Sequence, residues 1–566
     1  MKLLRWFLPI SVTAIVFAAG WMWWNRPQAI DMASYAPADA LVYLECNSLL
    51  DVADAIASTD AWKELSPLMG SNGSPLPSRW LTRVISWTGI GPTRSVVLAR
   101  SQLAAVMLDL GATEEGETLT VKPEAAVIIE THTSEVRIRA TVEDALRLFA
   151  EKSYRQPTLR KTDVAGTEFL VWSAPTSERQ IVATIDGSLV IIGNSEHAVK
   201  TCLEVRRGQR PSLKSHAEMQ QMRAHLASSD TLAFGFIPAS NAARLLSMGA
   251  PLLFGRAPGD ARFDGIIATS AAKVLAGVGW SSRKSSGGIE DHYVFSLQSA
   301  VASRMQPHFK PAASPIQVLD TLPDNVHSVS VYRFENPVTT WETLQTTLSS
   351  QLDTLSAMLV SALLRSALTP YGIDDPEKFL SLIGRELSTV RLTSETEQST
   401  LVAEVRDEAS LRQLLLGPAG RSQKHRSVGE AEMIEIPDKT LAVSIFKSRV
   451  LIGPPADLQQ HLHAATTNRA TPEDLKRFEH FLDRSNSANV VTYTQESDRV
   501  MKFMQAISRA SAGPTAGRES IELSRKIQQL PYSATETTLG NQGLERITLS
   551  SFGQFATLVP LLFPER

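Results

Sequence analysis

Hydrophobic and polar residues alternate, or cluster around a polar tip, in two stretches of the chain that read almost alike. They are TIDGSLVIIG, residues 184–193, and SIFKSRVLIG, residues 444–453, and matched residues lie 260 positions apart. Alternation with a period of two is typical of β-strands, and an Asp-Gly pair favours a tight hairpin turn. Both stretches therefore predict a β-hairpin, and their likeness suggests that one unit occurs twice.

Further short matches occur in the same order in the two parts of the chain. The distance from each residue to its match falls steadily, from 286 positions at the first pair to 255 at the last. Deletions within one copy of a duplicated segment produce such a steady fall, whereas chance matches would scatter. The matched pairs are Pro37 with Pro323, Gly89 with Gly372, Val127 with Leu401, Asp144 with Ala409, Gly166 with Gly429, Ile185 with Ile445 and Gly288 with Gly543.

The same patterns predict an α+β fold in which each copy is a largely antiparallel sheet with packed helices. Strand-like runs outnumber helical ones and follow one another as hairpins, which favours antiparallel pairing. We expect the copies to span residues 33–312 and 313–566. The predicted strands of the first copy are 41–45, 105–110, 125–130, 181–184, 189–192, 232–237, 274–280 and 293–297. The predicted helices are 142–151, 196–206, 216–227, 408–415, 455–465 and 472–484.

Two strongly apolar segments could contribute either to the core or to a binding surface. Leucines recur at helical spacing from Trp341 to Leu368, which predicts one long helix that ends before Pro370. The stretch LLSMGAPLLF, residues 245–254, is apolar around a glycine and a proline. Core packing explains both, and contact with a hydrophobic ligand or a partner is the alternative. The candidate contact residues are Leu245, Leu246, Leu252, Leu253, Phe254, Leu348, Leu352, Leu355 and Leu359.

The first 32 residues predict a cytoplasmic stub, a transmembrane signal anchor and a short linker. Lys2 and Arg5 precede an apolar run at 6–24 that ends in tryptophans. About 20 apolar residues cross a bilayer as a helix, and tryptophan favours the membrane interface. Cleavage after Ala18-x-Gly20 is the alternative to an uncleaved anchor. The positive charges place the N-terminus in the cytoplasm and the body on the extracytoplasmic side of the inner membrane. The lipid bilayer is thus the first expected partner, through residues 6–24.

Charge and motifs exclude several classes of function. The 566-residue chain has a formal net charge of −3, so it lacks the basic excess of a nucleic-acid-binding protein. It contains no phosphate-binding loop, no HExxH zinc motif and no nucleophile elbow. We therefore predict no catalytic, metal-binding or cofactor-binding residues and no cofactor. Cys46 and Cys202 are expected to be buried and unpaired, with a disulfide between them as the alternative.

Four features suggest a relationship to a known family. They are the basic leader with one span, the stretch APADALVYLECNSLLDVADAIASTDAWKEL, the Thr88-Gly89-Ile90 element and the strand–turn–strand–glycine–helix unit. Together they resemble a bacterial family of single-span, membrane-anchored extracytoplasmic proteins that is catalogued only as a domain of unknown function. The resemblance covers most of residues 33–555. It implies a periplasmic or envelope protein and transfers no catalytic residues.

The sequence predicts a non-enzymatic binding or scaffold module whose partner is an envelope protein or a lipid. The first alternative is a carrier or sensor of a lipid or other hydrophobic ligand held between the two repeats. The second is a hydrolase, because catalytic groups meet in space and need not form a sequence motif.

Overall fold

The computed structural model describes residues 30–69, 101–245, 271–467 and 487–562, apart from short gaps within these ranges. The gaps are 116–117, 155, 165, 243, 314–315, 317, 319–321, 324–325, 353, 396–397, 418–424, 437–439 and 512–518. The predicted anchor at 6–24, the predicted helix at 472–484, and the candidates Leu246, Leu252, Leu253 and Phe254 lie outside the described residues. Among the described helices, none combines the length and the apolar character needed to cross a bilayer.

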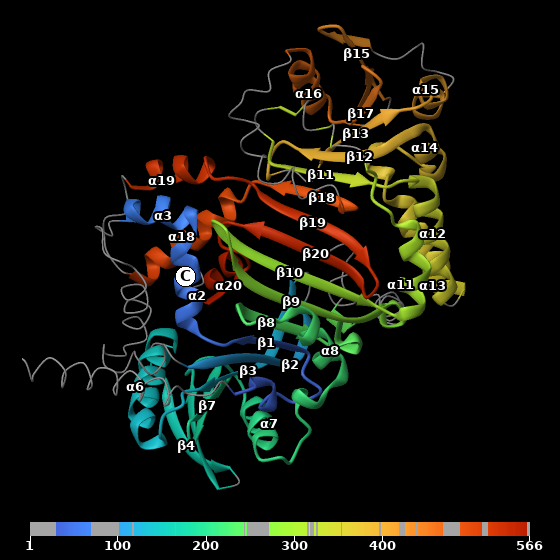
Figure 1. Cartoon of the computed structure of the whole chain (residues 1–566). Helices are drawn as coiled ribbons and strands as arrows, with labels where there is room; N and C mark the ends of the chain where they lie inside the picture. Colours follow the sequence, from blue (N-terminus) through green and yellow to red (C-terminus); the bar gives the residue numbers. More distant parts are fainter. Residues whose placement is uncertain are drawn as a thin grey trace, which may run out of the picture.

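The described strands form one 20-stranded antiparallel sheet, so the α+β fold class is confirmed (Figure 1). Across the sheet, the strands follow the order β4-β5-β6-β7-β3-β2-β1-β8-β9-β10-β20-β19-β18-β11-β12-β13-β17-β16-β15-β14. The strands of the first half are β1 (Val42–Cys46), β2 (Gln102–Glu115), β3 (Thr118–Glu130), β4 (Thr158–Val164), β5 (Thr167–Ser173), β6 (Gln180–Asp186), β7 (Leu189–Gly193), β8 (Thr231–Ile237), β9 (Leu275–Ser285) and β10 (Gly288–Leu297). Those of the second half are β11 (Ser328–Arg333), β12 (Ile383–Arg391), β13 (Thr400–Val405), β14 (His425–Val428), β15 (Ala431–Glu435), β16 (Ala442–Phe446), β17 (Arg449–Gly453), β18 (Val490–Thr494), β19 (Ser533–Gly540) and β20 (Gly543–Ser550).

Both predicted hairpins are present and have the same register. Thr184 pairs with Ile191 between β6 and β7, and Ser444 pairs with Leu451 between β16 and β17. In the second hairpin the turn residues Lys447 and Ser448 have positive φ angles of 47° and 60°, a conformation that a tight hairpin turn requires. Strand order and register therefore recur between the halves at the offset read from the sequence.

The two halves meet where β10 pairs with β20. The pairing runs from Ile289 with Ser550 to Ser296 with Gly543. Near its centre His292 pairs with Ile547. These two residues are also the ones that the 255-residue sequence offset matches with each other. The register of the pairing is therefore symmetric about this point.

Helices cover both faces of the sheet. We name each face by a neighbouring side chain of β1 that points to it, Tyr43 on one face and Leu44 on the other. The Tyr43 face is covered by α7, α8 and α16, and the Leu44 face by α2, α3, α6, α11, α12, α14, α15, α18, α19 and α20. The helix bounds are α2 (Leu49–Ser58), α3 (Asp60–Leu65), α6 (Glu135–Tyr154), α7 (Glu196–Arg206), α8 (Ala217–Leu226), α11 (Ser299–Met305), α12 (Pro337–Gln351), α13 (Thr354–Ser366), α14 (Pro376–Leu382), α15 (Glu408–Leu416), α16 (Pro455–Thr467), α18 (Ser497–Ser511), α19 (Glu519–Gln528) and α20 (Phe555–Leu562).

The prediction of one helix from 341 to 368 is wrong. The chain leaves the helix at Leu352, which is extended (φ −108°, ψ 156°), and α12 and α13 lie side by side (Figure 1). Hydroxyl groups near the break bind backbone carbonyls, as Ser350 does to Thr347 at 2.9 Å. Such bonds compete with the helical hydrogen bonds, so the apolar spacing alone gave too long a helix.

The two cysteines are both free, as expected. Cys202 is buried in the core on the Tyr43 face, whereas Cys46 is partly buried and packs into the core on the Leu44 face. The sheet lies between the two thiols, so they cannot form a disulfide. Burial raises the pKa of Cys46 to about 11 and that of Cys202 to about 12, which keeps both protonated at neutral pH.

A buried carboxyl group stands on the Leu44 face at the junction of the halves. Asp291 on β10 accepts hydrogen bonds from Trp280 Nε1 at 3.0 Å and from the backbone N–H of Gln554 at 2.9 Å. Burial raises the pKa of Asp291 from 3.8 to about 6. The folded state therefore holds this proton more tightly than the unfolded state does.

We expect Asp291→Asn to remove a pH-dependent loss of stability. Because the folded pKa is the higher one, Asp291 makes the wild-type protein less stable as pH rises from 4 to 6. The difference of about 2 pKa units corresponds to about 3 kcal/mol. Urea unfolding at pH 4 and pH 7 should show the stability of the wild type falling by most of that amount relative to the variant. Parallel pH profiles for the two proteins would contradict this assignment.

Candidate functional site

A pocket of about 1140 Å³ lies beneath α6 on the Leu44 face of the first half. Its floor comes from β3, β6 and β7, and one wall comes from α6. The apolar lining residues are Val127, Ile129, Val142, Ala145, Leu146, Phe149, Ile181, Val190 and Ile192. Ligand pockets in proteins typically enclose about 300–1000 Å³ and are mostly apolar with a few polar groups. Size and lining therefore suit a hydrophobic ligand.

The position of α6 leaves part of the sheet uncovered. Leu146 and Ala150 of α6 pack against Leu170 of β5 and Ala183 of β6. The helix thus lies mainly over β5 and β6, and it reaches β3 only near its start, where Ile138 and Val142 cluster with Ile129. On β3, residues 126 and 128 point into the core on the Tyr43 face, so Val127 must point to the opposite, Leu44 face. There Val127 is 40% exposed, and Phe149 across the pocket is 41% exposed.

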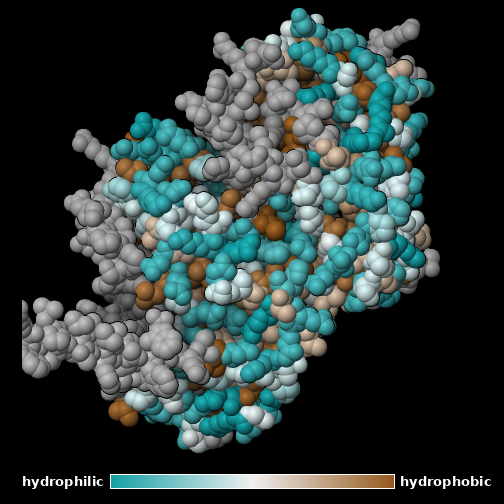
Figure 2. All heavy atoms as spheres, in the orientation of Figure 1, coloured by the Kyte–Doolittle hydropathy of each residue, from teal (hydrophilic) through white to brown (hydrophobic). Residues whose placement is uncertain are grey.

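Exposed hydrophobic side chains are frequent in the first half, and two of them, Val127 and Phe149, line the pocket. Val127, Val136, Phe149 and Leu159 account for half of the large hydrophobic side chains that are exposed in the described part of the chain. The coloured part of the face seen in Figure 2 is mostly hydrophilic, with hydrophobic residues scattered over it. Exposed apolar groups that gather around a concave site mark a place of interaction more reliably than scattered ones.

The corresponding strands of the second half, β13 and β17, are covered on this face. Val127 corresponds to Leu401 and Ile192 to Ile452, and both counterparts are fully buried. The cluster that covers them includes Ile373 and Phe379, from the segment between β11 and β12. In the first half, residues 70–100 of the corresponding segment lie outside the described residues. Among the described residues, the two halves therefore differ at this face.

The pocket rim carries both signs of charge. Lys122 Nζ lies 3.4 Å from Glu178 Oε2, and His197 Nδ1 lies 3.0 Å from Glu124 Oε1. The Arg179 guanidinium lies 5.8 Å from the centre of the Tyr154 ring. Burial raises the pKa of the Tyr154 hydroxyl, so this group stays neutral at physiological pH. A rim of paired charges does not select a strongly charged ligand, so the apolar floor must supply most of the affinity.

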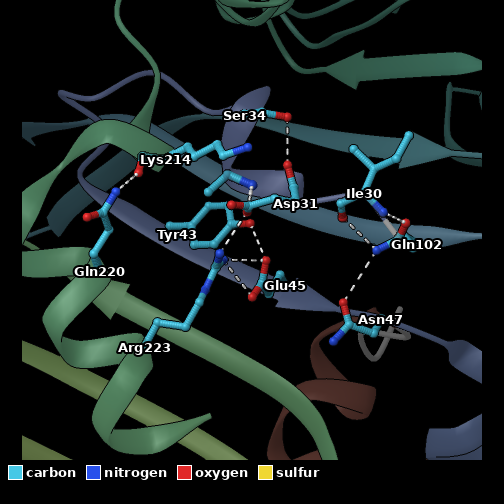
Figure 3. Close-up of polar contacts among 11 residues, drawn as sticks. Ile30, Asp31, Ser34, Tyr43, Glu45, Asn47, Gln102, Lys214, Gln220 and Arg223 are labelled. Atoms are coloured by element: carbon cyan, nitrogen blue, oxygen red, sulfur yellow. Dashed lines mark hydrogen bonds and ion pairs between the residues drawn. The ribbon is translucent and has the colours of Figure 1, made fainter. Parts of the chain in front are cut away.

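A second polar cluster, on the Tyr43 face, holds the start of the described chain (Figure 3). Arg223 of α8 binds Asp31 Oδ1 at 2.7 Å and both carboxylate oxygens of Glu45 at 2.8 Å. Tyr43 donates a hydrogen bond of 2.5 Å to Glu45, and Gln102 binds both backbone groups of Ile30. Both carboxylates are bound by Arg223, so we assign this cluster to structure: it fixes residues 30–31 to the body.

The candidate residues from the sequence do not contribute to this pocket as far as they are described. Leu245 is half-buried beside Arg244, which binds Asp109. Leu348 lies in α12, Leu352 at its end, and Leu355 and Leu359 in α13. The pocket is lined by residues of the first half, so it does not lie between the repeats. The sequence carried one signal for this pocket, the unbroken apolar run Val127-Ile128-Ile129. A strand buried on one face only would alternate apolar with polar residues, so this run indicates that both faces of β3 are apolar.

Comparison of the chain with protein-family models, with curated proteins and with solved structures found no match in any of the three.

Proposed function

We propose that this protein is anchored in the inner membrane by residues 6–24 and binds a long acyl chain in the pocket beneath α6. The body then lies on the extracytoplasmic side, and the protein acts as a binding module and not as an enzyme. The observation that carries the proposal is the apolar pocket with its exposed floor at Val127 and its exposed wall at Phe149.

Burial of apolar surface supports an acyl chain as the ligand. Each methylene group transferred from water contributes about 0.8 kcal/mol, so ten of them contribute about 8 kcal/mol. That corresponds to a dissociation constant of about 1 μM before the costs of immobilisation. The paired charges at the rim place no strong demand on the head group.

The tight fixation of the first described residues supports a location close to the bilayer. Met32 and Ala33 are fully buried, and Asp31 is bound by Arg223. Few residues separate this fixed point from the proposed span, so the body is held near the membrane, which is the source of acyl chains.

We also propose that residues 33–312 and 313–566 descend from one duplicated unit. The shared strand order, the shared register and the symmetric pairing of β10 with β20 support it. A duplication allows one copy to fill its pocket with its own side chains while the other keeps an open site.

We expect Val127→Glu to weaken the binding of a fluorescent long-chain fatty acid at least tenfold, because a carboxylate on an apolar floor must lose its hydration. Val136→Glu is the matched control, since Val136 lies in α6, is 88% exposed and does not line the pocket. Both variants should fold, because both positions are exposed.

Two results would contradict the proposal. One is equal binding by the wild type and Val127→Glu. The other is a photo-crosslinking result. If a photoreactive group at position 127 crosslinks to residues 70–100 of the same chain and not to added lipid, the pocket is filled by the chain itself and does not bind lipid.

A further inference from the structure

Three side chains that can bind a metal converge where the two halves join. They are His225 of α8, His292 of β10 and Glu545 of β20. His292 and Glu545 lie diagonally across the β10–β20 pair, on the Tyr43 face that α8 covers. One potential ligand atom from each residue lies within 4.8 Å of the other two.

The two distances between the carboxylate and the imidazoles suit tetrahedral coordination. Glu545 Oε1 lies 3.3 Å from His225 Nε2, and Glu545 Oε2 lies 3.4 Å from His292 Nε2. Ligand atoms bound to zinc at about 2.0–2.1 Å in a tetrahedron lie about 3.4 Å apart. Small rotations of the side chains would therefore bring one atom of each residue to a common ion.

The environment favours a cation over a simple ion-pair cluster. The Nε2 atom of His292 is buried and has no hydrogen bond of good geometry within the described part of the chain. The nearby Arg223 is already neutralised by Asp31 and Glu45.

Within the described residues the site occurs once, although the register of the junction is symmetric. The counterpart of His292 is Ile547, and the counterpart of Glu545 is Glu290. Glu290 binds Arg283 at 2.5 Å instead. The donor set of two imidazoles and one carboxylate is therefore specific to one side of the junction.

We propose that His225, His292 and Glu545 bind one Zn²⁺ ion that links the two halves of the protein. Two imidazoles and a carboxylate are a common set for zinc, with water in the fourth position. Two ligands come from the first half and one from the second, so the ion stabilises the junction between them. This site is independent of the acyl-chain pocket, which lies on the opposite face of the sheet.

Titration of the chelator-treated full chain in detergent with Zn²⁺ alone tests this proposal. We expect binding at one ion per chain by calorimetry, a rise in melting temperature with Zn²⁺ concentration, and a tetrahedral visible spectrum when Co²⁺ replaces Zn²⁺. Glu545→Gln and His225→Ala should each weaken binding at least tenfold and remove the Co²⁺ spectrum.

His197→Ala is the matched control, because His197 also faces a carboxylate, Glu124, but has no second histidine there in the described structure. It should bind Zn²⁺ as the wild type does. Absence of stoichiometric binding by the wild type would overturn the proposal. So would equal affinity of the wild type and Glu545→Gln, a nearly isosteric change whose folding can be checked by its melting temperature without metal.

Discussion

Replacement of Phe552 by alanine should lower the free energy of unfolding by about 3–5 kcal/mol, which is the usual cost of removing a buried aromatic ring. Phe552 follows β20 and is fully buried. Its ring centre lies 4.6 Å from that of Phe503 in α18 and 6.4 Å from that of Trp62 in α3. Since Trp62 belongs to the first half and Phe503 to the second, the cavity would open at the junction between the halves.

Urea unfolding followed by tryptophan fluorescence measures this effect. Ile521→Ala in α19 is the control, because Ile521 is 77% exposed and its truncation should change stability by no more than about 0.5 kcal/mol. A loss below about 1 kcal/mol for Phe552→Ala would show that the helices on the Leu44 face do not hold the halves together.

Replacement of Arg223 by methionine should also cost about 3–5 kcal/mol, because it leaves the nearly buried carboxylate of Glu45 without its counter-charge. Glu45 is almost buried, and its pKa is raised by burial, an effect that Arg223 opposes. Without Arg223 this pKa must rise further. The variant should therefore lose stability as pH rises above the unfolded-state value of Glu45, and its deficit should be smaller at pH 4 than at pH 8.

The double variant Arg223→Met with Glu45→Gln should recover part of the loss, since the uncompensated charge on Glu45 is then gone. A double-mutant cycle from urea unfolding of the four proteins gives the coupling free energy. Independent, additive effects of the two substitutions would mean that the ion pair seen in Figure 3 does not stabilise the fold.

Local patterns in the sequence predicted the local structure well. The hairpins at 181–193 and 441–453 are present, and the helix predicted at 196–206 has the observed bounds of α7. The β4–β5 hairpin was missed because β4 is an edge strand whose side chains are mostly exposed, so its sequence, TLRKTDV, lacks the apolar alternation of a half-buried strand.

Contacts between distant segments could not be predicted in this way. The pairing of β10 with β20 joins residues about 250 positions apart, and neither strand carries a signal for the other. The pocket depends on where α6 lies over the sheet, and the zinc site depends on three separate elements. Both sites are products of tertiary packing, which short motifs do not record.

Native mass spectrometry of the full chain, purified from membranes in mild detergent, tests acyl-chain binding without a choice of probe. We predict one acyl lipid per wild-type chain, retained by Val136→Glu and lost from Val127→Glu. A wild-type chain that carries no lipid, or a Val127→Glu chain that carries as much lipid as the wild type, would contradict acyl-chain binding beneath α6.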